Sequence, residues 1–356
     1  MKTDVAIVGG GPAASAAAIM LGRAGMAVAI VERGDDRGDK PGESLAPAVR
    51  PLLEQLGVWD DLYADGHLPC HGNRSSWGAD AVDEMPFIFT PYGHGWHLDR
   101  RKFERLLAAR AAEAGAQRVT RTSVSDVQRD GQRWRLQCAG GSVIESRFVV
   151  DATGRAGSIA RRMGAQRIVD DSLIAMVAFL VPEAEGDRDS FTLVEAVEHG
   201  WWYSAVLPDA RLAAMFVTDP VVVSARSTRT RDDWNVRLAS APLTRERIER
   251  FRYKLPEAPR CVDAGSARLD RVAGKGWLAI GDAAMALDPL SSHGIAAALA
   301  GGIEAAAAIS AGASIECCER YERVIDASWI AYVAMRRSFY AAERRWSGTP
   351  FWRRRT

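Results

Sequence analysis

Residues 4–32 read DVAIVGGGPAASAAAIMLGRAGMAVAIVE, which is a strand, a glycine-rich turn, a helix and a second strand in succession. The apolar runs at residues 4–8 and 26–31 predict the strands, because each is short and bounded by turn-forming residues. Residues 13–24 are strong helix formers, and Pro12 stands at the first helical position, where a missing N–H is tolerated. The pattern predicts an N-terminal βαβ unit of the Rossmann type.

The glycine-rich turn has the chemistry of a dinucleotide-binding loop. Gly9 permits a tight turn, Gly11 lets the backbone approach a pyrophosphate, and Ala14 keeps the helix close to the strand. The start of the helix presents free N–H groups to the phosphates. Glu32 ends the second strand, where an acid binds ribose hydroxyls, so FAD or NAD is favoured over NADP. The predicted cofactor residues of this unit are Gly9, Gly11, Pro12, Ala13, Ala14, Glu32 and Arg33.

Length and composition are those of an ordinary globular protein. The chain has 356 residues, of which 47% are hydrophobic and 26% charged, and its formal net charge is +1. The length favours two closely joined domains, although one large core could also account for it. The charge balance gives no reason to expect nucleic acid or an anionic membrane as a partner. Five cysteines without a CxxC spacing, no metal-ligand spacing and no long uninterrupted apolar run predict a cytoplasmic protein with no metal site and no membrane span.

The rest of the chain predicts an α/β fold: a Rossmann-like FAD-binding domain, an antiparallel β-sheet substrate domain and C-terminal helices. Residues 58–96 look irregular, whereas the chain from 173 to 223 has the β-rich runs of an antiparallel sheet. Helices are expected at residues 99–115, where Asp99 is the N-cap, and 294–311, and strands at 118–124, 133–138, 143–150 and 277–280. The predicted domains are 1–80, 97–165 and 270–312 for FAD binding, 81–96 and 166–269 for substrate, and 313–356 as a C-terminal helical basic segment.

A second cofactor segment lies far downstream of the first. Gly281 and Asp282 follow a short strand, and residues 288–295 (DPLSSHGI) open an alanine-rich helix. The positive end of that helix can face reduced flavin, an effect worth about 0.3–1 kcal/mol. The arrangement resembles the second FAD fingerprint of group A flavin monooxygenases, tryptophan halogenases and geranylgeranyl reductases, whose aspartate binds the ribityl chain. This resemblance implies FAD as the cofactor, with contacts from Gly281, Asp282, Pro289, Gly294 and Ile295.

Three further segments extend the resemblance over most of the chain. Residues 41–45 (PGESL) resemble the Gly-Glu-Ser segment that these enzymes place beside the flavin, and Arg100 resembles the arginine that reaches the phosphates. Residues 151–158 (DATGRAGS) stand where single-component hydroxylases carry an Asp-Gly motif, but a threonine precedes the glycine here. No separate nicotinamide site is evident, so reduced flavin is expected from a partner reductase or from transiently docking NAD(P)H. The cofactor contacts that these segments imply are Glu43, Ser44, Arg100, Asp151 and Gly154, and the resemblance also implies that Val124 lies on a strand near the adenine.

The resemblance implies monooxygenation, in which reduced flavin activates O2 for attack on an electron-rich aromatic ring. Halogenation by related enzymes requires a lysine amine in the region after the Gly-Glu-Ser segment, and no lysine lies between Glu43 and Trp96. The halogenase pattern Trp-x-Trp-x-Ile-Pro is replaced by residues 200–208 (GWWYSAVLP). A small-molecule hydroxylase or halogenase of natural-product biosynthesis, a flavin-dependent alkene reductase and a non-catalytic FAD-binding module remain as alternatives.

More specifically, the sequence resembles flavoproteins of the LodB/GoxB and QhpG type, which modify a precursor protein during the biogenesis of tryptophan-derived quinone cofactors. The resemblance is carried by residues 41–45, 73–78 (NRSSWG), 200–208, 288–295 and 351–354 (FWRR). It implies that the substrate is a tryptophan side chain of a partner polypeptide.

The candidate substrate and partner contacts have plain structural explanations as well. Trp77, Trp201 and Tyr203 are expected to line the substrate site, and core packing explains each of them equally well. His293 is the candidate for proton handling, although it could be a capping residue. The last twenty-one residues hold seven arginines against the single acid Glu343, which suits docking of a protein partner or simply a solvated helix end.

Overall fold

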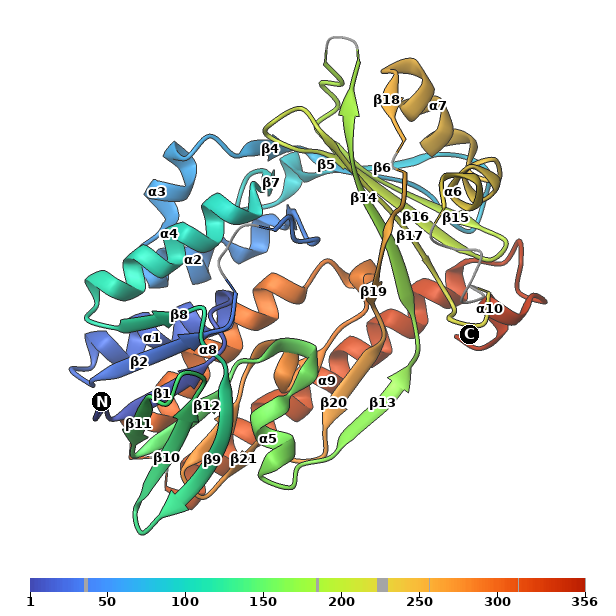
Figure 1. The fold of residues 1–356 in the computed structure, drawn as a ribbon. Helices are drawn as coiled ribbons and strands as arrows, with labels where there is room; N and C mark the ends of the chain where they lie inside the picture. The colour runs from blue at the N-terminus through green and yellow to red at the C-terminus, as the bar shows by residue number, and fades with distance from the viewer. Residues whose placement is uncertain (35–37, 184–185, 223–229, 256, 313, 356) are drawn as a thin grey trace.

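The computed structural model describes residues 1–34, 38–183, 186–222, 230–255, 257–312 and 314–355. The predicted α/β class is present: a mostly parallel sheet with helices forms one part, and a large, mostly antiparallel sheet forms the other (Figure 1). Within the described residues, no helix is both long and apolar enough to span a bilayer.

The first part is built on a six-stranded sheet in the order β21-β22-β12-β1-β2-β8, in which only the β21–β22 pair is antiparallel. Its strands are β1 (Val5–Val8), β2 (Val28–Glu32), β8 (Gln117–Thr120), β12 (Phe148–Asp151), β21 (Ala273–Gly274) and β22 (Trp277–Ala279). The helices that pack on it include α1 (Pro12–Arg23), α4 (Arg100–Glu113) and α8 (Gly294–Ser310). α1 and α8 touch so closely that a Cβ on Gly302 would lie 2.4 Å from the Ala13 carbonyl oxygen. Small residues therefore allow the two helices to pack this closely.

Two of the expected strands are each divided in the structure. Residues 118–124 divide at Arg121, which has a left-handed φ of 55°, and the chain then enters β9 (Val124–Asp130), a strand that the pattern missed. Residues 143–150 divide at Arg147 into β11 (Val143–Ser146) and β12. β9, β10 (Arg133–Cys138) and β11 form a separate three-stranded antiparallel sheet.

The second part is the eight-stranded sheet, whose path runs β18-β14-β17-β16-β15-β5-β6, with β19 paired to β14. The strands are β5 (Gly72–Ser76), β6 (Asp83–Pro86), β14 (Ile174–Pro182), β15 (Phe191–Val197), β16 (Gly200–Val206), β17 (Leu212–Thr218), β18 (Tyr253–Lys254) and β19 (Arg260–Asp263). Side chains of β16 alternate between two cores, as the pattern predicted. Trp202 packs under α6 (Arg231–Leu238) and α7 (Pro242–Arg250), whereas Trp201 and Tyr203 face the other side.

The stretch before Trp96 is more ordered than its composition suggested. β3 (Ser44–Leu45), β4 (Leu68–Cys70) and β7 (Gly95–His97) form a small antiparallel sheet with β7 in the centre. β5 pairs in parallel with β15, so it belongs to the large sheet and not to the FAD-binding part where the predicted boundary at residue 80 put it. The cause is tertiary pairing with a strand that lies more than a hundred residues later, which no local pattern reports.

The C-terminal helix α9 (Ile315–Ala342) connects the two parts (Figure 1). Near its start, the Tyr321 hydroxyl donates to the Ala279 carbonyl at 2.7 Å, in the parallel-sheet core. Near its end, the Tyr340 hydroxyl accepts from Nε1 of Trp201 at 3.1 Å, in the antiparallel-sheet core. The remaining elements are α2 (Arg50–Leu56), α3 (Trp59–Ala64), α5 (Ser158–Arg162), α10 (Pro350–Arg353), β13 (Arg167–Asp171), β20 (Ser266–Leu269), β23 (Met285–Ala286), and the 3-10 turns η1 (Pro47–Val49), η2 (Phe87–Phe89), η3 (Gly154–Ala156), η4 (Gly281–Ala283) and η5 (Pro289–Ser291).

Candidate cofactor and substrate site

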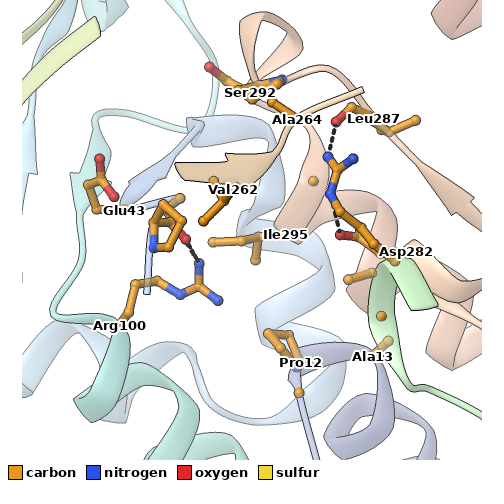
Figure 2. Close-up of a pocket in the computed structure, with 18 of the residues that line it drawn as sticks. Pro12, Ala13, Glu43, Arg100, Val262, Ala264, Asp282, Leu287, Ser292 and Ile295 are labelled. Carbon is orange, nitrogen blue, oxygen red and sulfur yellow. Dashed lines mark hydrogen bonds and ion pairs between the residues drawn. The ribbon is translucent and has the colours of Figure 1, made fainter. Parts of the chain in front are cut away.

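A cavity of about 340 Å³ lies between the two parts of the molecule. Residues that follow β1, β12 and β22 form one side, and residues of β14, β16, β17 and β19 form the other. Figure 2 shows Glu43 and Arg100 at one end, Asp282 and Leu287 at the other, and Ile295 between them. The predicted cofactor residues that line it are Gly11, Pro12, Ala13, Ala14, Glu43, Ser44, Arg100, Gly154, Asp282, Pro289, Gly294 and Ile295. The early and late motifs therefore meet around one cavity.

The glycine turn after β1 has the geometry that a nucleotide-binding loop needs. Gly9 has a φ of 110°, and a Cβ there would lie 2.1 Å from the Ala152 carbonyl oxygen, so a side chain cannot be accommodated. At Gly11, an added Cβ would meet no atom of the chain within 4 Å, so this backbone borders open space. Within the described residues, no side chain caps the N-terminus of α1. A free helix N-terminus beside open space is suited to bind an anionic phosphate.

Glu32 and Arg33 lie beside this turn but outside the cavity lining. The Glu32 carboxylate accepts from the backbone N–H of Gly10 at 2.5 Å and from that of Gly34 at 2.5 Å. Arg33 is exposed. Glu32 is therefore at the predicted place, the end of β2, but its oxygens bind the loop itself. The roles of Glu32 and Arg33 toward a ribose stay predictions.

The late loop reaches the cavity through Asp282. Gly281 is not in the lining, and its φ of 57° and close approach to Ala13, whose Cβ would lie 2.9 Å from an added Cβ, set the loop against α1. Nε of Arg155 lies 3.7 Å from Oδ2 of Asp282, and the same guanidinium donates to the Leu287 carbonyl at 2.7 Å (Figure 2). The Asp282 side chain keeps 38% of its surface open to the cavity, but the surrounding protein atoms still desolvate it and raise its pKa. Arg155 joins the site from the motif at 151–158.

Asp288 and His293 belong to the same loop but do not face the cavity. The buried Asp288 carboxylate accepts from the Tyr340 hydroxyl at 2.7 Å and from the Leu290 N–H at 2.9 Å. Burial raises the pKa of Asp288 to about 6. His293 is exposed, is the N-cap residue of α8 and contacts the Ser291 carbonyl, so its role in proton handling stays a prediction.

Two other predicted cofactor contacts have structural roles in this chain. Asp151 is buried, and its carboxylate accepts from the N–H and hydroxyl of Thr153 and from the N–H groups of Ile159 and Ala160. It therefore holds the turn that carries Gly154 and caps α5, but it does not line the cavity. Val124 packs against the parallel-sheet core at the start of β9. The sequence pattern did not separate loop-supporting residues from cavity-lining ones.

The expectation that three aromatic side chains line the substrate site needs a correction, because the C-terminal segment covers two of them. Tyr203 lines the cavity, but Trp77 and Trp201 do not. Trp201 is buried against Tyr340, and Trp77 donates its indole N–H to the Phe339 carbonyl at 2.7 Å. α9 and α10 cover this part of the sheet face, which the strand pattern alone could not reveal.

Several wall residues were missed by sequence reasoning. Ala175, Met215 and Val262 supply apolar surface from three strands of the large sheet, and Asp263 and Ala264 follow them. No local signal distinguishes them from ordinary strand residues, because their exposure to the cavity depends on how the large sheet is docked.

The residues present fit FAD. Besides the uncapped start of α1, two buried polar atoms of the wall have no hydrogen-bond partner among the described residues: Nε of Arg100 and Oε2 of Glu43. The remaining guanidinium nitrogens of Arg100 hold the loop before Glu43, donating to the Pro41 carbonyl at 2.6 Å, and pair with Glu104 at 2.7 Å. Burial raises the pKa of Glu43. Unpaired donors and acceptors at a cavity wall are suited to a ligand with phosphates and a polar ring system.

Most charges of the basic C-terminal segment are paired within the chain. Arg345 pairs with Glu343 at 2.6 Å, Arg354 with Asp219 at 2.9 Å and Arg355 with Asp171 at 2.8 Å, and Arg336 contacts Asp170. The exposed arginines that no ion pair within the described residues engages are Arg337, Arg344 and Arg353. The segment therefore attaches the C-terminus to β13 and to the residue that follows β17 of the large sheet.

The chain is similar in sequence to flavin-dependent enzymes. The model of the tryptophan halogenase family matches residues 4–70 and 78–356. The chain is 25% identical to LodB of Marinomonas mediterranea, whose name describes an FAD-dependent oxidoreductase, over 99% of this chain and 96% of LodB. It is 26% identical to the tryptophan 2-halogenase of Chondromyces crocatus, over 99% of this chain and 70% of that protein.

The chain also resembles solved structures of such enzymes. The flavin-dependent halogenase CmlS superposes with a TM-score of 0.87 at 27% identity, over 100% of this chain and 68% of CmlS. The peptidyl tryptophan dihydroxylase QhpG, described as essential for tryptophylquinone cofactor biogenesis, superposes with a TM-score of 0.83 at 25% identity, over 100% of this chain and 79% of QhpG.

Proposed function

The chain belongs to the tryptophan halogenase family of flavin-dependent enzymes, and from this membership we propose that it is an FAD-dependent monooxygenase that hydroxylates an electron-rich aromatic ring. The observation that carries the proposal is the cavity in which two distant FAD motifs meet, with an apolar sheet as its opposite wall and no lysine among the described residues that line it.

The cavity walls divide the work of holding the cofactor. The start of α1 and Arg100 would bind the phosphates, Asp282 would accept from the ribityl hydroxyls, and the start of α8 would face the pyrimidine end of the flavin. When bound, FAD supplies the redox chemistry and the reaction with O2. The apolar side chains of Met215 and Val262, which line the cavity, would help to exclude water from the site once the cofactor is bound.

The lack of a lysine among the described lining residues supports hydroxylation more than halogenation. The basic side chains in the lining are Arg100 and Arg155, and a guanidinium does not offer the unprotonated amine that handling of hypohalous acid is expected to need. Halogenation is the second candidate, because the family and several relatives carry that activity in their names. We propose that electrons come from NAD(P)H or from reduced flavin supplied by a reductase.

For the substrate, we propose a tryptophan side chain of a partner polypeptide. The similarity to QhpG, which is described as a peptidyl tryptophan dihydroxylase, extends over this entire chain and supports a polypeptide substrate. In the last twenty-one residues, Arg337, Arg344 and Arg353 are exposed and have no ion pair among the described residues, so they are available to dock such a partner.

The test is a turnover experiment with purified FAD-loaded protein. Tryptophan-containing peptides, with phenylalanine-for-tryptophan peptides as matched controls, are incubated with a flavin reductase and NADH, with and without O2, and with and without chloride or bromide. Hydroxylation predicts an O2-dependent gain of about 16 mass units per event on the tryptophan peptide only. A mass gain that requires halide would replace the proposal by halogenation. Turnover without O2 would replace it by alkene reduction, and FAD binding without substrate-stimulated reoxidation would leave a non-catalytic module.

A further inference from the structure

A second hollow, of about 410 Å³, lies directly beside the cofactor cavity. It is lined by side chains of β13, by the start of β14, by Pro220 and by β19, and we call it the β13 hollow. Val262 and Asp263 of β19 line both spaces, so the two adjoin. A ligand that occupies the β13 hollow therefore lies next to the cofactor cavity.

The strand β13 turns its two faces to different surroundings. Arg167, Val169 and Asp171 alternate along the strand and line the hollow. Ile168 lies opposite Arg268 in the register with β20, and the Arg268 guanidinium contacts α9 on the other side of this small sheet (Figure 1). Because side chains of a strand alternate between its faces, one face of β13 borders the hollow and the other faces α9.

The β13 hollow has an apolar floor that is partly open to solvent. Val169 exposes 59% of its surface, Pro220 is exposed, and Ile174 and Val262 are half-buried. A single exposed valine needs no explanation, but apolar side chains gathered beside a cavity are suited to bind part of a ligand that continues into it.

The charged side chains inside the hollow neutralise one another. Nη2 of Arg167 lies 3.2 Å from Oδ2 of Asp263. Nε of Arg355 lies 2.8 Å from Oδ2 of Asp171. Both acids of the lining are therefore engaged by arginines of the chain itself.

Two exposed arginines at the ends of the hollow have no ion pair among the described residues. Arg161, in α5, lines a small pocket that also includes Arg167. Arg353, in α10, is two positions before Arg355, which pairs with Asp171 of the hollow. A neutralised interior with positive charge at its ends favours a ligand that carries negative charge on either side of an apolar part.

We propose that the β13 hollow binds an extended acidic segment of the partner polypeptide and presents the tryptophan of that segment to the cofactor cavity. The apolar floor contacts the segment, and Arg161 and Arg353 attract the acidic side chains that flank its tryptophan. Val262 is the side chain past which the indole ring enters the cavity. This assignment rests on the proposed function for the substrate, and it adds the surface and the charge by which the substrate is recognised.

The most exposed apolar side chains of the large sheet are less suited to this role. Ile88 and Phe89 expose 80% and 88% of their surface and follow the edge strand β6. Glu84 and Pro86 stand in that strand, and a charge and a proline protect a sheet edge against pairing with another chain. None of these four residues lines the cofactor cavity.

The test measures binding separately from turnover. A fluorescein-labelled synthetic peptide with one tryptophan flanked by glutamates is titrated with the FAD-loaded protein, and its fluorescence anisotropy gives the dissociation constant. The matched peptide has lysines in place of the glutamates. We expect the acidic peptide to bind at least about tenfold more tightly, and the difference to shrink as added salt screens the arginines.

Charge substitutions on the two faces of β13 locate the binding surface. Val169→Glu places an acid on the floor of the hollow and should weaken binding of the acidic peptide at least about tenfold, whereas Val169→Lys should bind it at least as tightly as the wild type. The matched control is Ile168→Glu, which makes the same change at the neighbouring residue and should stay within about twofold of the wild type. Arg161→Glu should weaken binding, and Arg320→Glu, at an exposed arginine near the start of α9, should not.

Equal binding of the two peptides, or equal effects of Val169→Glu and Ile168→Glu, would overturn the assignment. A dimer in gel filtration that Val169→Glu dissociates would overturn it as well, because the hollow would then be an interface between two copies of the chain. If the acidic peptide binds as expected but gains no mass with O2, the proposed function fails and the docking surface stands. If the peptide gains mass but Val169→Glu leaves its KM unchanged, the docking surface fails and the proposed function stands.

Discussion

The cavity has two walls of different construction. On the side of the parallel sheet, the Gly9 turn and the starts of α1 and α8 bring the main chain to the wall, beside side chains such as Asp282 and Arg155. On the side of the antiparallel sheet, it is made of side chains, such as Tyr203, Met215 and Val262. A backbone wall depends on a few short motifs, whereas a side-chain wall depends on the register of many strands.

This difference suggests a division of labour. The FAD of a flavoprotein family presents the same phosphates and ring in every member, so its binding can be fixed by backbone geometry. The substrate differs between members, and a wall of exchangeable side chains can change without disturbing the cofactor. Substitutions on the two walls are therefore expected to fail in different ways.

The largest effect is expected from Gly9→Ala on the backbone wall. The new Cβ would lie 2.1 Å from the Ala152 carbonyl oxygen at a φ of 110°, so β1 and β12 would have to separate. We expect the free energy of unfolding to fall by about 3 kcal/mol or more, with loss of bound FAD. Urea unfolding and the FAD content after gel filtration measure both quantities.

The control is Gly11→Ala, which adds the same methyl group where no atom of the chain lies within 4 Å. Apoprotein stability should change by less than about 1 kcal/mol, whereas FAD affinity should fall at least about tenfold, because the methyl enters the space assigned to the pyrophosphate. Equal behaviour of the two variants would mean that the Gly11 side is not a phosphate site.

The motifs of the backbone wall could be predicted from sequence because each acts within a few residues. Pro12, Gly9 and the Asp99 cap are examples, since their conformations follow from their own chemistry. The place of Met215 in the cavity wall could not be predicted, because it depends on how the large sheet docks. The contact between Ser44 and Thr192 could not be predicted either, because the two residues are 148 positions apart in sequence. Trp201 shows the same limit: its strand face was predicted correctly, but a helix near the C-terminus covers it.

The free energy of unfolding should depend on pH through Asp288, a buried residue of the late loop that contacts Tyr340 of α9. Its pKa is about 6 in the folded protein and near 3.8 when exposed, so the folded state holds this proton more tightly. The stabilising contribution is complete below pH 4 and is lost as pH rises through 6, by up to about 3 kcal/mol. Urea unfolding from pH 4.5 to 7.5 should show a smaller loss of stability with rising pH in Asp288→Asn than in the wild type. An identical pH slope in both proteins would contradict this assignment.

A smaller loss of stability is expected when the contact between Asp288 and Tyr340 is removed by substituting the tyrosine. Tyr340→Phe removes the hydroxyl that donates to Asp288 and accepts from Trp201, and leaves both partners buried. We expect a loss of about 1–3 kcal/mol in the free energy of unfolding and weaker retention of FAD, since the late loop is less firmly held. Thermal unfolding with and without added FAD separates the two effects. Retention of FAD equal to that of the wild type would show that the C-terminal helix does not support the cofactor loop.

A smaller loss of stability than in Tyr340→Phe should come from Tyr203→Phe on the side-chain wall. The cavity keeps its shape and Ser44 keeps its contact with Thr192, so the free energy of unfolding should fall by only about 0.5–1.5 kcal/mol. The matched control is Tyr321→Phe, which removes a buried hydroxyl donating to the Ala279 carbonyl in the parallel-sheet core. The two variants should lose similar stability and keep similar amounts of FAD, but only Tyr203→Phe should alter the absorbance of the bound flavin and the response to an aromatic ligand. A flavin spectrum that changes in Tyr321→Phe as much as in Tyr203→Phe would mean that the two walls are mechanically coupled, and that side chains of the sheet wall cannot vary independently of the cofactor.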